Sequence, residues 1–107
     1  MNEAERRAAR HYVLRGYSIL GANVRAGGNE LDLIARRGRR LVFCEVKERD
    51  RADYGDPAEL VGSEKQRRVR RAAETWLAVH PELQDLEVCF DVVTVGGGRL
   101  ARLANAF

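Results

Sequence analysis

A chain of 107 residues is long enough for one domain with a single core. Its composition, with 45% hydrophobic and 33% charged residues, argues against wholesale disorder. Its net charge of +3, from 19 basic and 16 acidic side chains, is only a weak indication of a polyanionic partner. No apolar run approaches the roughly 20 residues of a membrane span, and the charged N-terminal stretch lacks a signal peptide's apolar centre. We therefore expect one cytoplasmic domain over residues 1–107 that does not contact a membrane.

The first half of the chain predicts a helix followed by a three-strand meander. Asn2 and Glu5 form a capping-box pattern at the start of a helix over residues 3–15, which Gly16 ends. Glycine-containing turns then separate three strand-like stretches. These predicted strands span residues 17–24, 29–37 and 40–49. The third is apolar on both faces, which is typical of a central strand.

The second half predicts a loop, a helix and a strand. Turn residues and scattered charges over residues 50–62 indicate a mobile loop. Ser63 and Gln66 form a capping-box pattern at the start of a helix whose apolar stripe includes Trp76. A fourth strand follows over residues 86–95, and the last residues form a short strand or tail. This order implies an α/β fold with a mixed central sheet flanked by helices.

Charged side chains interrupt the two strands that look most apolar. Residues two apart in a strand share a face, so Glu30 and Asp32 point the same way, as do Glu45 and Lys47. The apolar residues between them are expected to build the other face: Leu31, Leu33, Cys44 and Val46. If the hairpin joins the charged faces, three carboxylates and one ammonium meet at one site.

Three carboxylates are too many for one cation to neutralise. An ionised carboxylate in a dry sheet costs on the order of several kcal/mol unless it is paired or binds metal. The pattern therefore indicates a hard divalent ion such as Mg²⁺ or Mn²⁺. Such an ion lowers the pKa of a coordinated water and stabilises the charge that grows on a phosphate, which implies metal-assisted phosphodiester hydrolysis.

Lysine is rare in this chain, since only Lys47 and Lys65 among the 19 basic residues are lysines. Because nearly every other basic residue is an arginine, a lysine indicates a position where a compact ammonium, whose pKa shifts readily on burial, has a specific role. Lys47 is expected to hold the attacking water or to neutralise the phosphorane. Asp91, between two apolar residues, is expected to be a satisfied structural carboxylate, although its setting also suits a role supporting the site.

The order of these residues resembles a known nuclease signature. Asp32 followed by Glu45-x-Lys47 on adjacent predicted strands is similar to the PD-(D/E)xK signature of restriction-endonuclease-like nucleases. Further motifs follow along the chain: "NVRAGGNELDLI", "LVFCEVKER", "YG" at 54 and 55, Val61 with Lys65, "FDVV" and the final "NAF". In this order they resemble the YraN-like family of small uncharacterised bacterial proteins, which is expected to be nuclease-like and similar to Holliday junction resolvases.

That resemblance implies a fold and a set of site residues. The fold is the restriction-endonuclease-like αβββαβ core. Metal ligands would come from Asp32, Glu45 and the backbone of Val46, with Lys47 as the catalytic cation and Glu30 as a further site carboxylate. Glu5 matches an acidic residue that relatives carry on the first helix, although a capping role alone also explains it.

Basic residues near the predicted site favour a nucleic-acid partner, most simply DNA. Lys65 and Arg68 lie in the first turns of the second helix, where positive side chains oppose the helix dipole, so phosphate contacts explain them better than a solvated face. Arg25 and Arg49 flank the acidic segments. We expect these two residues to guide a phosphate backbone or to pair with the carboxylates.

Three functions agree with these patterns. The first is a Mg²⁺- or Mn²⁺-dependent endodeoxyribonuclease acting on structured or branched DNA, with a homodimer expected because resolvase-like relatives cut two strands with two sites. The second is a non-catalytic nucleic-acid-binding module of a repair or recombination assembly. The third is an adaptor protein whose acidic cluster is only an ion-pair network.

Overall fold

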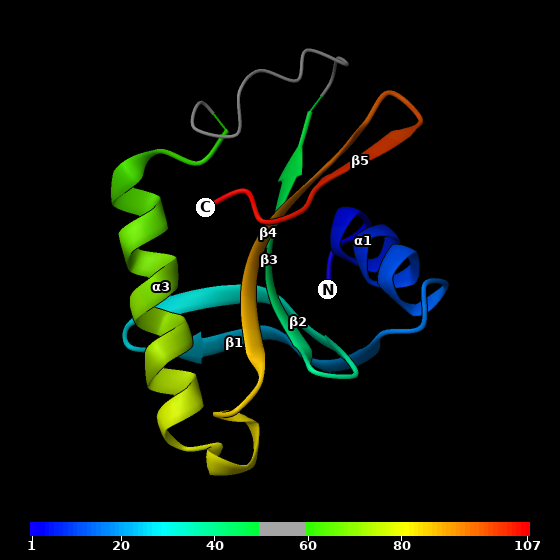
Figure 1. Cartoon of the computed structure of the whole chain (residues 1–107). Helices are drawn as coiled ribbons and strands as arrows, with labels where there is room; N and C mark the ends of the chain where they lie inside the picture. The colour runs from blue at the N-terminus through cyan, green and yellow to red at the C-terminus, as the bar shows by residue number, and fades with distance from the viewer. Residues whose placement is uncertain (50–59) are drawn as a thin grey trace.

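A five-stranded mixed sheet lies at the centre of the protein, with one helix on each face (Figure 1). The computed structural model describes residues 1–49 and 60–107. The strands lie in sequence order: β1 Ser18–Ala26, β2 Asn29–Arg37, β3 Arg40–Glu48, β4 Glu87–Gly96 and β5 Arg99–Leu103. All neighbours are antiparallel except β3 and β4, which run parallel. The predicted α/β fold is confirmed, and it is compatible with a restriction-endonuclease-like core.

The two helices begin in different ways. In α1 (Glu3–Val13) the Asn2 side chain accepts the Glu5 N–H and the Glu5 carboxylate accepts the Asn2 N–H, both at 2.8 Å, which confirms the predicted capping box. In α3 (Ser63–Ala78) the N-cap is Gly62, which has no side chain to cap with, so the prediction that Ser63 caps this helix is wrong. A short 3₁₀ helix, η1 Pro81–Leu83, then leads into β4.

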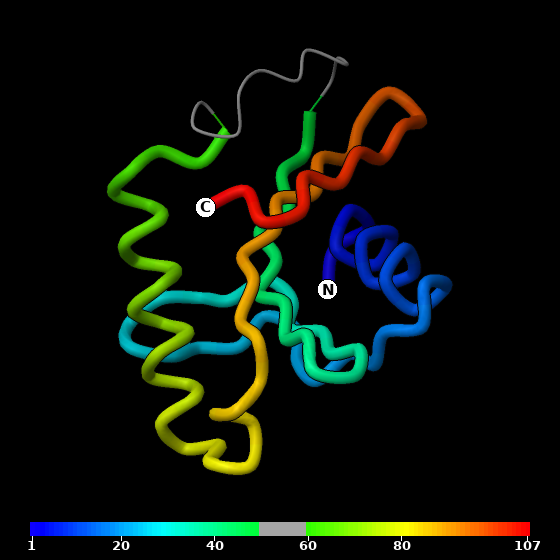
Figure 2. The backbone as a smooth tube through the Cα atoms, viewed as in Figure 1, coloured from blue at the N-terminus to red at the C-terminus, as the bar shows by residue number. Residues whose placement is uncertain are grey.

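Each helix covers a separate apolar cluster on its own side of the sheet. Beneath α1, Ala8 and Tyr12 are fully buried against the sheet. Beneath α3, Trp76 packs edge-on against Phe43, with ring centroids 5.8 Å apart. The chain's last residues return to the α3 side (Figure 2), where Phe107 packs in this cluster. No helix in the described ranges is long and apolar enough to cross a membrane.

Strands β1 and β2 both change faces midway. Leu33 and its β1 partner Ala22 pack beneath α1, whereas Leu31 and its partner Val24 pack beneath α3. Between Ala22 and Val24, Asn23 has the left-handed φ of 51°, which breaks the regular alternation of a strand. The expectation that Leu31 shares a face with three other apolar residues is therefore wrong. Those three do pack together beneath α1: Leu33, Cys44 and Val46.

The end of the predicted mobile loop is well packed. Leu60 and Val61 are only 5% and 1% exposed and form a small cluster with Val92 of β4. The prediction of a mobile loop is therefore wrong for these two residues, because burial of their side chains anchors the chain before α3. Residues 50–59 of the predicted loop lie outside the described part of the chain.

Candidate active site

Three carboxylates from two elements converge near the start of β2. Glu5 on α1 and Glu30 and Asp32 on β2 each offer one oxygen, and these oxygens lie within 4.8 Å of one another. Glu5 is buried, Asp32 is half-buried and Glu30 is exposed, so the group opens to solvent on one side. The capping-box role of Glu5 therefore does not exclude a site role, because the same carboxylate serves the helix and joins this cluster.

Asp32 is oriented by the neighbouring strand. The ladder between β2 and β3 runs from the pair Arg37–Arg40 to the pair Leu33–Cys44, and just beyond it the Val46 N–H donates to Asp32 Oδ2 at 2.9 Å. This contact involves the N–H of Val46, and the expected role of its carbonyl as a metal ligand stays a prediction. Burial raises the pKa of Asp32 above its ordinary value, against the lowering effect of the Val46 N–H.

Glu45 is the most deeply buried carboxylate of the predicted set. It is 3% exposed, its Oε2 lies 3.6 Å from the Lys65 ammonium, and its buried Oε1 has no hydrogen-bond partner among the described residues. Burial raises the pKa of Glu45 to about 7, and the charge of Asp32 adds to this shift while Lys65 and Lys47 oppose it. Buried oxygens without partners are rare in folded proteins and need an explanation.

Both lysines of the chain act on the same carboxylate. Lys47 follows Glu45 by two residues on β3, and Lys65 reaches Glu45 from the first turn of α3. Lys47 is half-buried and lies opposite Thr94 of β4, whereas the Lys65 side chain is 39% exposed. The sequence does not predict the Lys65–Glu45 contact, and the expected phosphate contact of Lys65 stays a prediction beside it.

Of the predicted arginines, the strand pairing places only Arg25 beside a member of the cluster. Arg25 is exposed and lies opposite Glu30 in the β1–β2 pairing, while Arg68 is exposed on α3. The Arg49 N–H donates to the Val95 carbonyl at 2.8 Å, which extends the β3–β4 pairing by one residue. Arg25 and Arg68 are thus exposed and Arg49 is partly exposed, and the phosphate contacts of all three stay predictions.

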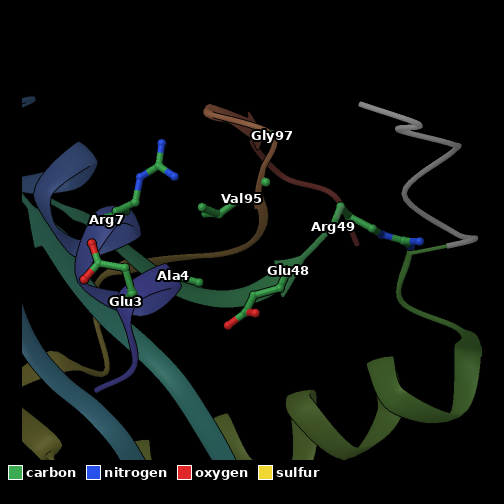
Figure 3. A pocket seen from close by; sticks show the side chains of 8 residues that line it. Glu3, Ala4, Arg7, Glu48, Arg49, Val95 and Gly97 are labelled. Carbon is green, nitrogen blue, oxygen red and sulfur yellow. The ribbon is translucent and has the colours of Figure 1, made fainter. Parts of the chain in front are cut away.

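A cleft of about 290 Å³ opens between the start of α1 and the turn that joins β4 and β5 (Figure 3). In this view the Arg7 and Glu3 side chains project from α1, while the Arg49 side chain extends away from them toward α3. The wall of the cleft is closely packed at Gly96, because a Cβ atom there would clash with the Arg49 carbonyl oxygen. The cleft shares the first turn of α1 with Glu5.

Asn23 belongs to the cluster and was not among the predicted site residues. Its Nδ2 donates to Glu5 Oε2 at 2.9 Å and to Glu30 Oε1 at 3.0 Å, so one amide joins two of the three carboxylates. An asparagine in a strand-like stretch is the signal that could have found it, since Asn tolerates a positive φ better than most residues. Its partners could not be inferred, because they lie on two other elements.

The donors fit a hard divalent cation. Carboxylate oxygens are the ligands that Mg²⁺ and Mn²⁺ prefer, and an octahedral ion needs only one or two of them when water completes its shell. Three carboxylates with a fourth buried nearby also carry more negative charge than the two lysines neutralise. The arrangement defines an α/β protein with a carboxylate-rich centre between α1 and the start of β2.

Comparison with known proteins identifies the family. Residues 4–95 match the uncharacterised protein family UPF0102. A UPF0102 protein of Frankia casuarinae is 45% identical over 105 residues, covering 94% of this chain and 88% of that protein. One from Nitrobacter winogradskyi is 42% identical, covering 97% and 87%. The chain belongs to the UPF0102 family, which supports the resemblance to YraN-like proteins.

Proposed function

We propose that this protein is a Mg²⁺- or Mn²⁺-dependent endonuclease that hydrolyses phosphodiester bonds in structured or branched DNA. One observation carries the proposal. The Glu5, Glu30 and Asp32 carboxylates converge within 4.8 Å, beside a buried Glu45 whose Oε1 is without a partner in the described structure. An ion-pair network alone would leave this excess of negative charge uncompensated.

Asp32 is the carboxylate best placed to hold the cation. It lies in the cluster with Glu5 and Glu30, and its charge also acts on Glu45. The Val46 N–H fixes the Oδ2 atom of Asp32, and Oδ1 is the oxygen that would bind the cation. When bound, the cation supplies a Lewis acid for the charge that develops on the phosphate and a coordinated water of lowered pKa.

The lysines supply positive charge beside the reacting phosphate. Lys47 lies on the same strand face as Glu45, where an ammonium can donate hydrogen bonds to a phosphate oxygen or to the attacking water. Lys65 is half exposed, so it can exchange its long contact with Glu45 for a phosphate of the substrate. Exposed Arg25 and Arg68 would position the DNA backbone without reading bases.

The proposal is tested by incubating the purified protein with branched, flapped and linear DNA, with and without Mg²⁺ or Mn²⁺. Cleavage is expected only with metal, and Asp32→Asn and Lys47→Ala are each expected to reduce it at least about 100-fold, in the range of lost electrostatic groups. Asp85→Asn is the matched control, because Asp85 is exposed and far along the chain from the cluster. Cleavage that is unchanged in Asp32→Asn would overturn the assignment, whereas salt-sensitive binding without cleavage would favour a non-catalytic binding module.

A further inference from the structure

We propose that Asn23 is a positioning residue that holds Glu5 and Glu30 in place around Asp32. The metal-binding consequence of this role rests on the proposed function. The role itself rests on two hydrogen bonds from one amide group and on the backbone conformation that brings that amide to the cluster. Asn23 is not one of the residues predicted to bind metal or substrate.

The Asn23 amide joins two elements of the fold. Its Nδ2 donates to a carboxylate of α1 and to a carboxylate of β2, at 2.9 Å and 3.0 Å. A primary amide has two N–H donors and no charge, so it can hold two anions at a fixed separation without neutralising either. Their negative charge therefore remains available to a cation. A lysine or arginine in the same place would compete with that cation.

Glu5 is held at both of its oxygens. Oε1 accepts the Asn2 N–H at 2.8 Å as part of the capping box, and Oε2 accepts the Asn23 amide. The helix cap alone would leave the carboxylate free to turn about its last torsion. With the second contact the plane of the Glu5 carboxylate is defined, as is required of a ligand that meets a cation of fixed geometry.

The backbone of Asn23 explains how the cluster forms. Asn23 lies between the pairs Ala22–Leu33 and Val24–Leu31, opposite Asp32, at the point where both strands change faces. Its φ of 51° lies in the left-handed region, which costs energy for any residue with a side chain. Glycine would adopt this backbone more easily, so the backbone alone does not account for the asparagine.

A buried carboxylate outside these hydrogen bonds supports a ligand at the cluster. Glu45 is 3% exposed, the charge of Asp32 acts on it, and its Oε1 lacks a partner in the described ranges. The three clustered carboxylates repel one another in the absence of a cation, and Asp32 also repels Glu45. A residue that sets the positions of two of them therefore sets the geometry of the cation site.

The first arm of the test separates the side chain from the backbone. Asn23→Gly keeps the left-handed conformation and removes the amide. The matched control is Asn105→Gly, because Asn105 (φ 52°) is the other non-glycine residue of positive φ in the described ranges, and its contact to Asp91 uses the backbone N–H. Asn23→Gly is expected to fold and to bind Mn²⁺ about 10- to 100-fold more weakly by calorimetry, as for loss of a group that orients ligands. Asn105→Gly is expected to match the unsubstituted protein.

The second arm needs no metal. In ¹⁵N-labelled protein, the two Nδ2 protons of Asn23 are expected to shift separately, one in Glu5→Gln and the other in Glu30→Gln. If the two Nδ2 proton signals are averaged and neither shifts in Glu5→Gln or Glu30→Gln, the positioning role is overturned. It is also overturned if Asn23→Gly and Asn105→Gly bind Mn²⁺ with equal affinity. If the unsubstituted protein binds no Mn²⁺, the proposed function fails, and the amide signals still decide the role of Asn23.

Discussion

Asp91 and Glu45 are two similarly buried carboxylates that differ in their hydrogen-bond partners. Asp91, on β4, is 1% exposed and accepts hydrogen bonds from the Tyr12 hydroxyl at 2.7 Å, the Arg102 guanidinium at 2.9 Å and the Asn105 N–H at 3.0 Å. Glu45, on β3, is 3% exposed and has one ion pair within the described ranges, at 3.6 Å. Two carboxylates of similar burial therefore differ in how many hydrogen bonds they accept.

The difference has a physical basis. Donors around Asp91 come from α1, β5 and the segment after β5, so this carboxylate connects three parts of the chain, as expected for a satisfied structural residue. Glu45 instead lies beside a second carboxylate, and its surroundings raise its pKa to about 7. Groups whose pKa is perturbed by both burial and a like charge are characteristic of functional sites.

The largest effect on stability is expected at Asp91. Asp91→Asn removes the charge that pairs with the Arg102 guanidinium, whose side chain is 17% exposed. The free energy of unfolding is expected to fall by about 3 kcal/mol or more, as for other broken buried pairs, when measured by urea denaturation. Metal affinity of the folded variant is expected to stay the same. A loss below about 1 kcal/mol, the value of an exposed pair, would contradict the structural role of Asp91.

Glu45→Gln is expected to act in the opposite direction. A carboxyl whose folded pKa is raised from 4.5 to about 7 contributes stability below pH 4.5 and loses it as the pH rises through 7. Metal-free protein should therefore become less stable between pH 5 and pH 8, and Glu45→Gln should remove that slope. At pH 8 the variant is expected to be up to about 3 kcal/mol more stable, from 1.36 kcal/mol per pKa unit. Parallel pH dependences in both proteins would show that Glu45 is already compensated.

The smallest effect is expected at Lys65. Its ammonium lies 3.6 Å from Glu45 and its side chain is 39% exposed, so Lys65→Met is expected to change the free energy of unfolding by less than about 1 kcal/mol. DNA affinity should fall further, with a reduced dependence on salt. If Lys65→Met loses as much stability as Asp91→Asn, Lys65 fully compensates the Glu45 charge. Glu45 would then be a satisfied structural carboxylate like Asp91.

Much of the fold follows from local sequence. Glycine turns, apolar alternation and the capping box of α1 place the first helix and the first four strands within two residues of the observed ones. The prediction for Ser63 is wrong because a capping-box pattern also fits one residue inside a helix, and the N-cap of α3 is Gly62. The face change at Asn23 could not be predicted, because strand alternation assumes a regular backbone.

The candidate site is only partly predictable for the same reason. Strand spacing identifies Glu30, Asp32, Glu45 and Lys47, because residue types and intervals are local properties. Contacts between elements are not local: Lys65 reaches Glu45 from α3, and Glu5 reaches the cluster from α1. Such contacts depend on how helices pack on the sheet, which the sequence pattern does not specify.

The most direct test of the account is a calorimetric titration of Mn²⁺ into the unsubstituted protein, Asp32→Asn and Asp91→Asn at one pH. If the under-satisfied carboxylates form a metal site and Asp91 is structural, the unsubstituted protein and Asp91→Asn bind with equal affinity. Asp32→Asn then binds at least about 100-fold more weakly, above the usual effect of losing an outer-shell partner. Equal affinity in the unsubstituted protein and Asp32→Asn, or no binding in either, would contradict the central claim.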